Sequence, residues 1–194
     1  QAVAVTQAVK ADYAFDVELD SAKVNWRARY EPNANPRLRL VAPERATLEN
    51  DERRAFDRMA EDFEGVSWCA GERMDRVADV RLVREDDATA TYSFQPTPES
   101  MRSEQARRFA DRMRGEMGIT KDQPDITRMR IFAPEPFSPA PLVRVDQFNM
   151  LITCQTAPNG RRYAADTTME MRGSAFGQNF GQRTEQRARN LRGS

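Results

Sequence analysis

The sequence predicts an α+β protein that is mainly antiparallel β, in which a single curved sheet of roughly eight to eleven strands forms a half-barrel with two helices on its concave face. Three observations lead to this fold class. Apolar and polar residues alternate with a period of two along much of the chain, turn signals separate these runs, and only two segments show helical spacing. Such runs joined by short turns are typical of an antiparallel sheet, because parallel strands need long crossovers.

The chain is expected to open with an antiparallel meander. Apolar side chains alternate with acidic ones in residues 13–20, and a second alternating run occupies residues 24–30. The Pro-Asn-Ala-Asn-Pro run at 32–36 predicts a turn, after which residues 38–40 alternate again as a third strand.

Two segments have the spacing of amphipathic helices. The first begins near Asn50, a good N-cap, and ends near Gly65, and the second runs from about Glu99 to Arg114. The apolar faces contain Phe56, Met59, Ala60 and Phe63 in the first helix and Ala106, Phe109, Ala110 and Met113 in the second.

The remaining segments predict strands and turns. The proline-rich run at 134–141 is best interpreted as a stiff connector between strands, with a polyproline recognition ligand as the alternative. Asn159-Gly160 is a strong hairpin signal. We expect one domain over residues 1–194, with flexible ends at about 1–10 and 186–194. The expected strands are 66–69, a hairpin over 80–94, 117–119, 126–132, a hairpin over 142–155 and 161–172, and a polar strand or frayed tail over 177–194.

The chain contains no histidine. This excludes Ser-His-Asp and Cys-His catalysis, His-ligated zinc or iron, and a histidine base near neutral pH. The run Gly173–Gly177 has the wrong spacing for a nucleophile elbow. A hydrolase that uses two carboxylates remains possible without histidine, but among the 30 acidic residues no two stand out as a catalytic pair. We therefore expect a non-enzymatic protein with no cofactor and no bound metal.

The charge balance argues against a nucleic-acid partner, and the hydropathy of the chain argues against a membrane span. Thirty basic and 30 acidic residues cancel, and nucleic-acid binding rests on a basic surface, so we expect no nucleic-acid partner. The cluster of Arg183, Arg187, Arg189 and Arg192 is expected to be a solvated strand edge or tail. No apolar run approaches the roughly 20 residues of a membrane-spanning helix, so no membrane span is expected.

Two cysteines, Cys69 and Cys154, form either one disulfide or two buried thiols. The chain starts at Gln1 in a stretch of small residues, which is typical of a mature protein after signal removal, although a trimmed fragment would look the same. We therefore expect a periplasmic or secreted protein, and this location favours the disulfide.

Aromatic side chains would gather on one face of this sheet. They belong to Tyr13, Phe15, Trp26, Tyr30, Tyr92 and Phe94. Ordinary core packing is one interpretation. The other is a partly open concave face that binds an apolar ligand, with the helix residues Phe56, Met59, Phe109 and Met113 on its opposite side.

Three segments carry a resemblance to a known family. They are residues 90–96 with a Tyr-x-Phe-x-Pro ending, residues 130–134, and the expected hairpin over residues 142–172. With the order of elements, they resemble the periplasmic lipoprotein-carrier (LolA-like) superfamily. The resemblance implies a half-barrel whose open side is filled by helices, and binding of acyl chains or another apolar cargo.

Two functions are therefore expected. The first is a non-enzymatic cell-envelope protein that binds a lipid or acyl chain in the concave face of the half-barrel. The second is an envelope interaction module with a closed core, which binds another protein through a sheet edge or the proline-rich loop.

Overall fold

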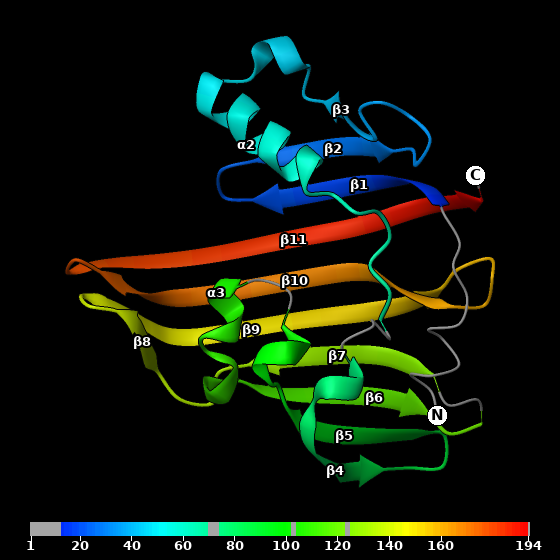
Figure 1. Cartoon of the computed structure of the whole chain (residues 1–194), viewed down its shortest axis with the longest axis vertical. Coiled ribbons are helices and arrows are strands. Elements are labelled where there is room, and N and C mark those ends of the chain that lie inside the picture. Colours follow the sequence, from blue (N-terminus) through cyan, green and yellow to red (C-terminus); the bar gives the residue numbers. More distant parts are fainter. Residues whose placement is uncertain (1–12, 70–73, 102–103, 123–124, 194) are drawn as a thin grey trace.

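A single antiparallel sheet contains all eleven strands of the described part of the chain. The computed structural model describes residues 13–69, 74–101, 104–122 and 125–193 (Figure 1). The strand order is β3-β2-β1-β11-β10-β9-β7-β6-β5-β4, with β8 added beside β9. The prediction of one antiparallel sheet is confirmed, and the sheet is open, with β3 and β4 as its edges. The strands are β1 (Tyr13–Ser21), β2 (Asn25–Tyr30), β3 (Leu38–Ala42), β4 (Ala78–Glu85), β5 (Thr89–Gln95), β6 (Arg114–Thr120), β7 (Ile126–Phe132), β8 (Phe137–Ala140), β9 (Val143–Thr156), β10 (Arg162–Ala175) and β11 (Gln178–Gly193).

The prediction of two helices is wrong, and the protein is mostly β rather than α+β. Within the described ranges, α2 (Asn50–Glu61) is the one helix longer than a turn. The segment expected to be the second helix contains only the short turns η3 (Pro98–Ser100), α3 (Glu104–Arg107) and η4 (Ala110–Arg112), and is called here the α3 segment. The other short turns are η1 (Arg45–Thr47) and η2 (Met74–Arg76).

Side-chain contacts explain why the α3 segment is broken. Gln95 Nε2 donates hydrogen bonds to the carbonyls of Ala110 (2.7 Å) and Met113 (2.9 Å), and a helix continuing to Arg114 would use the Ala110 carbonyl for its own backbone bond. The backbone of Met113 is extended, and Arg114 is already the first residue of β6. Tertiary contacts therefore override the helical spacing here.

Helix α2 begins with a capping box. Glu49 is the N-cap, and its backbone N–H donates to Glu52 Oε2 at 2.9 Å. The cap lies one residue before Asn50, the N-cap that the sequence favoured.

Cross-strand pairing divides the side chains of the sheet into two faces. The pairs Val17–Ala188, Met169–Met150 and Met117–Met129 share one face, called here the inner face. Helix α2 and the α3 segment both lie on this side of the sheet (Figure 1). The opposite side, called the outer face, carries charged side chains, several of which form ion pairs across neighbouring strands, such as Arg29 with Asp16 and Arg187 with Glu18.

Within the part of the chain that the structure describes, buried residues form three clusters, of which two lie at opposite ends of the inner face and the third surrounds Cys69 and Cys154. The first core lies over β1, β2 and the end of β11, and includes Phe15, Trp26 and Phe56. The second core, over β5, β6 and β7, contains Phe94, Met117 and Met129.

The loop after α2 crosses the inner face between these cores. Trp68 forms a single bridge with Tyr163, and the backbone N–H of Ala164 donates to the Ser67 carbonyl at 2.8 Å. Cys69 and Cys154, the pair for which a bridge was expected, are joined by a disulfide with a Cα–Cα distance of 6.3 Å. The loop is therefore anchored covalently to β9.

The end of the chain belongs to the sheet. Residues 186–193 lie in β11, between β1 and β10, whereas the sequence led us to expect a flexible end there. Cross-strand pairing explains the difference, because β11 has a polar sequence but is paired throughout, with β10 over residues 178–187 and with β1 over residues 184–193. The expected flexible start at residues 1–10 lies outside the described residues.

Candidate apolar site on the inner face

The first group of expected ligand-binding residues forms a filled core. Tyr13, Phe15, Trp26, Tyr30 and Phe56 are only 2–5% exposed. The Trp26 and Phe56 rings meet edge to face, with their centroids 5.4 Å apart. The partly buried Met59 packs against this core. Since α2 already occupies this end of the inner face, a ligand would have to displace it to reach these side chains.

The second group lies at the other end of the sheet. Phe94 is buried in the second core, against which Tyr92 packs. The Phe94 ring covers Gly115 on the neighbouring strand so closely that a Cβ atom at Gly115 would fall within 3.0 Å of three of its carbon atoms. The ring therefore uses its face for packing within the sheet.

The two residues of the α3 segment have different surroundings. The Phe109 ring contacts the Phe137 ring of β8, with a centroid distance of 5.3 Å, whereas Met113 is buried. The ten expected residues thus divide between packed regions at both ends of the inner face, and they do not line one common site.

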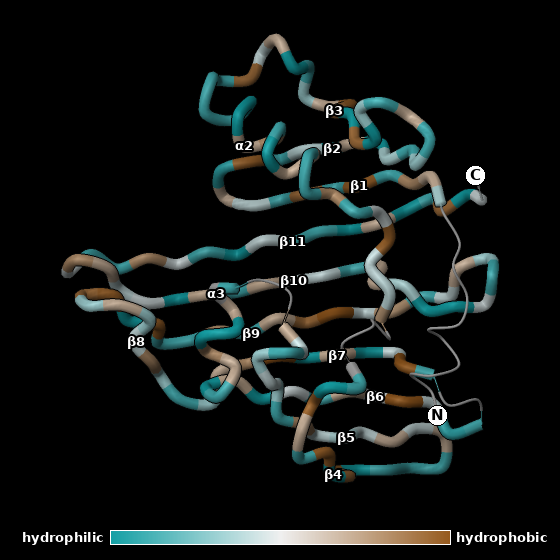
Figure 2. Tube along the Cα trace, viewed as in Figure 1, coloured by the Kyte–Doolittle hydropathy of each residue, from teal (hydrophilic) through white to brown (hydrophobic). Residues whose placement is uncertain are grey.

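An apolar strip that the sequence reasoning did not assign extends from the second core, against which Ile131 and Ile152 pack, toward the first core. It crosses three neighbouring strands through the direct pairs Met169–Met150, Met171–Phe148 and Ile131–Met150. Figure 2 shows the hydrophobic stretch in the middle of β9 from which it is built. The members of the apolar strip are all partly buried and are Ile131, Phe148, Met150, Ile152, Met169 and Met171.

The surroundings of the apolar strip set its extent. Toward one end of β9 it stops at the disulfide loop, since Cys154 follows Ile152 on the same face. Toward the other end, Phe137 is paired with Val145, and Phe109 packs on Phe137. From Phe148 to Ile152 the strip is about 13 Å long, at a strand rise of about 3.3 Å per residue.

A sequence signal for this strip existed, since residues 148–152 are the most apolar run of the chain. What a single run could not reveal is its partner strand. The strip exists because β7 pairs with β9 and β9 with β10 in one particular register, and a shift by one residue would place these side chains on the outer face.

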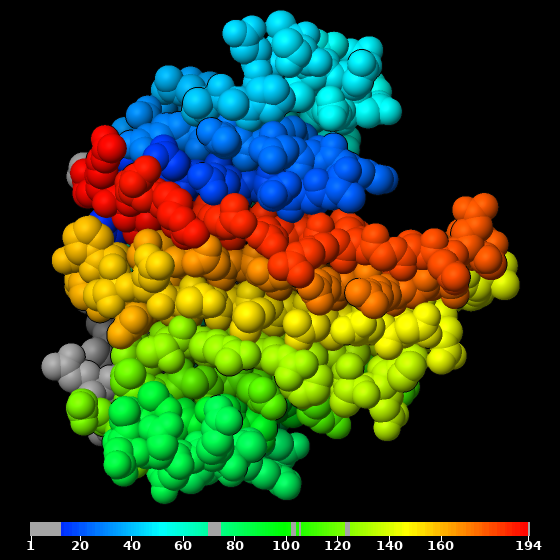
Figure 3. Space-filling model, turned by 180° about the vertical axis from the view of Figure 1, so that it is seen from behind, coloured from blue at the N-terminus to red at the C-terminus, as the bar shows by residue number. Residues whose placement is uncertain are grey.

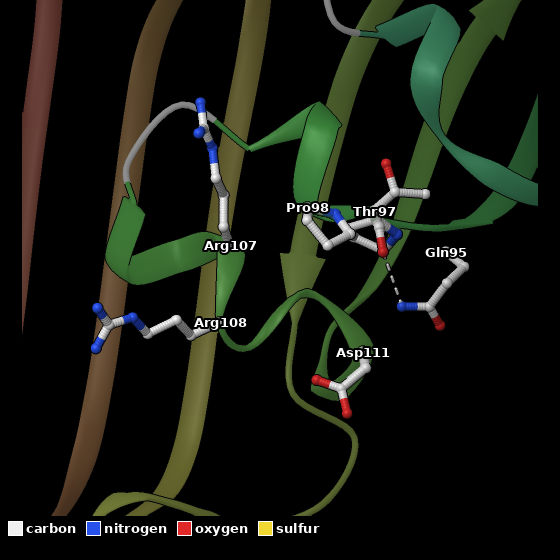
Figure 4. A pocket seen from close by; sticks show the side chains of 7 residues that line it. Gln95, Thr97, Pro98, Arg107, Arg108 and Asp111 are labelled. Atoms are coloured by element: carbon white, nitrogen blue, oxygen red, sulfur yellow. Dashed lines mark hydrogen bonds between the residues drawn. The ribbon is translucent and has the colours of Figure 1, made fainter.

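The α3 segment borders a shallow pocket of about 510 Å³, shown in Figure 4. Its lining includes Gln95, Thr97 and Arg107. Each of these side chains hydrogen-bonds to backbone: Gln95 as described above, Thr97 Oγ1 to the Arg76 carbonyl at 2.7 Å, and Arg107 Nε to the Met101 carbonyl at 3.2 Å. These three side chains therefore hold the turns around the pocket in place.

The outer face has an electrostatic pattern of its own. Hydrogen bonds from the Asn190 amide and the Arg29 guanidinium, each at 2.7 Å, hold the pKa of Asp16 below its ordinary value. The Arg183 guanidinium lowers the pKa of Glu185 in the same way. Arg183, Arg187 and Arg189 of β11 thus lie within the sheet and pair with carboxylates, rather than at an edge or in a tail.

In the described ranges of the chain, no group of three or more histidine, cysteine, aspartate or glutamate side chains is arranged to hold a metal ion. A search of those ranges also finds no helix long and apolar enough to cross a membrane.

Comparison of the chain with protein-family models, with curated proteins and with solved structures found no match.

Proposed function

We propose that the protein is a non-enzymatic cell-envelope protein that binds an elongated apolar ligand, such as an acyl chain, along the apolar strip. The observation that carries this proposal is the pairing of Met169 with Met150 and of Met171 with Phe148 on the inner face, outside both packed cores. Methionine is flexible and polarisable, and it adapts to apolar partners of varied shape. An acyl chain of varied length and unsaturation is a ligand of this kind.

The disulfide supports an exported setting for this function. Disulfides persist in oxidising compartments such as the periplasm, and thiols in the cytosol are kept reduced. The Cys69–Cys154 bridge also fixes the loop that limits one end of the strip. The proposal therefore includes a periplasmic or secreted location.

The test is binding of a fluorescent fatty acid by the protein and by two variants. The strip variant is Met150→Gln with Met169→Gln, which keeps side-chain length but makes the inner face polar. The control is Leu151→Gln, on the same strand but on the outer face, where Leu151 pairs with Arg130 and Thr168.

We expect the strip variant to weaken binding by about tenfold or more, because loss of apolar burial by two side chains is worth at least about 1.4 kcal/mol. The control should bind like the wild type. Equal affinity of the strip variant and the wild type, or no saturable binding at all, would reject the proposal.

A second candidate function rests on the sheet edge formed by β4. All eight residues of β4 are exposed, and Val80, Leu82 and Val83 are 49–59% exposed. An unpaired, partly apolar edge can accept a strand from another protein. The proline-rich connector is less suited to this role, because its β8 residues are already paired with β9.

Native mass spectrometry of protein purified from a membrane-containing lysate separates the two candidates. Co-purifying lipid supports the carrier, whereas a stoichiometric protein that is lost in a Val80→Lys, Leu82→Lys variant supports the edge module.

A further inference from the structure

Two tight turns lie side by side at one end of the long strands. In the first, Pro141 and Leu142 connect β8 to β9, and in the second, Phe176 and Gly177 connect β10 to β11. The backbone N–H of Phe176 donates to the Leu142 carbonyl at 2.8 Å, so the two turns form one unit, called here the hairpin tip. The tip projects beyond the rest of the sheet in both views (Figures 1 and 3).

The hairpin tip displays two large apolar side chains to solvent. Leu142 is 74% exposed and Phe176 is 77% exposed, which are the two highest values among the exposed large hydrophobic residues of the described chain. Apolar groups this exposed at one projecting point are typical of a contact site rather than of a fold requirement.

The backbone at both positions favours other residues. Leu142 has φ +62° after a proline, which is the position that type II turns give to glycine or asparagine. Phe176 has φ +52° and Gly177 φ +78°, so this two-residue loop has the two positive φ angles of a type I′ turn, whose first position favours asparagine. At two adjacent turns a bulky apolar residue thus stands where turn geometry disfavours it, and strain of this kind concentrates at functional sites.

The charges around the tip indicate the partner. No aspartate or glutamate occurs in residues 137–145 or 171–184, whereas Arg144 and Arg172 are present and exposed. Arg144 is partly neutralised by Asp146 at 2.6 Å, so apolar insertion dominates over charge attraction. Exposed apolar side chains next to arginines, with few carboxylates, match the interface of a lipid bilayer.

We propose that the hairpin tip docks on a lipid bilayer by inserting Leu142 and Phe176 at the headgroup boundary. This inference does not rest on the proposed ligand of the apolar strip, because the tip and the strip are different residues. The strip variant (M150Q with M169Q) should bind vesicles like the wild type, so the two proposals fail separately.

The test is vesicle flotation with phosphatidylcholine alone and with phosphatidylcholine mixed with phosphatidylglycerol. The tip variant is Leu142→Gly with Phe176→Asn, and the control is Val41→Ser, at a site that is 63% exposed on the edge strand β3. We expect the wild type and the control to float with vesicles, more with the anionic mixture. The tip variant should bind on the order of a hundredfold more weakly, since burial of each side chain contributes more than a factor of ten.

Two further measurements make the result decisive. The tip variant should have an equal or higher Tm, because its new residues suit the turns, so lost binding cannot be attributed to unfolding. In F176W the new indole emission should shift to the blue on vesicles and be quenched by brominated acyl chains, whereas that of V41W should not. The proposal would be overturned by any of four results: no flotation of the wild type, equal flotation of the tip variant, a lower Tm of the tip variant, or an unquenched F176W indole. If the true partner of the tip were a soluble protein, the wild type would not float with vesicles.

Discussion

Substitution of Gly115 by alanine is expected to destabilise the protein through a single clash. Gly115 on β6 is directly opposite Phe94 on β5, and an added Cβ would lie within 3.0 Å of three carbon atoms of the Phe94 ring. Since the ring is buried together with Met117 and Met129, making room for the Cβ would disturb the packing of the second core. Overpacking of this kind typically costs about 1–3 kcal/mol of unfolding free energy.

The matched control is Gly118→Ala on the same strand. There the added Cβ would meet Thr127 Oγ1 at 3.5 Å, an ordinary contact. This change should be neutral or should stabilise by roughly 0.4–1 kcal/mol, because alanine restricts the unfolded chain. Urea denaturation measures both: at an m value of about 2 kcal/mol/M, a loss of about 2 kcal/mol lowers the midpoint by about 1 M.

A double-mutant cycle tests the cause. Phe94→Ala by itself should cost roughly 3–5 kcal/mol, but it removes the ring that Gly115→Ala would strike. The double variant should therefore be more stable than the sum of the single effects predicts, by roughly 1–3 kcal/mol. If Gly115→Ala is no more destabilising than Gly118→Ala, or if the two effects simply add, the Phe94 ring does not cover Gly115 and the reasoning is refuted.

Two other predictions concern the removal of the disulfide and the dependence of stability on pH. Replacing Cys69 and Cys154 by serine should lower the unfolding free energy by up to about 4.6 kcal/mol in the chain-entropy model, since the bridge spans 85 residues; chemical denaturation measures this, and an unchanged midpoint would contradict it. Because the pKa values of Asp16 and Glu185 are lowered in the folded state, their stabilisation is present above their unfolded pKa values of about 4–4.5 and is lost as the pH falls through the lower folded values. The Tm should therefore decrease as the pH is lowered below about 4.5. The D16N variant should show a smaller fall than the wild type, and an identical pH profile would argue against the contribution of Asp16.

The strands were largely predictable from the sequence because their signal is local. Period-two alternation in residues 13–20 and the Asn159-Gly160 turn each encode a strand or a hairpin without reference to the rest of the chain. The absence of histidine likewise limits the possible chemistry whatever the fold.

The second expected helix, which the protein does not form, shows that tertiary contacts can override a local sequence pattern. Its apolar spacing was correct for a helix, but the Gln95 side chain, on a neighbouring strand, takes up two carbonyls of the segment. β11 shows the opposite case, since a polar sequence became a central strand by pairing with β1 and β10. Both outcomes depend on residues distant in the sequence.

The candidate site also depended on tertiary pairing. The sequence alone determined that aromatic side chains would collect on one face of a sheet, because alternation places them there. Only the tertiary structure decided that the aromatics of β1 and β2 are covered by α2, and that Met150 and Met169 meet between the two cores. The physical reason is that burial depends on which strands become neighbours and in which register, and these are properties of long-range pairing rather than of any single segment.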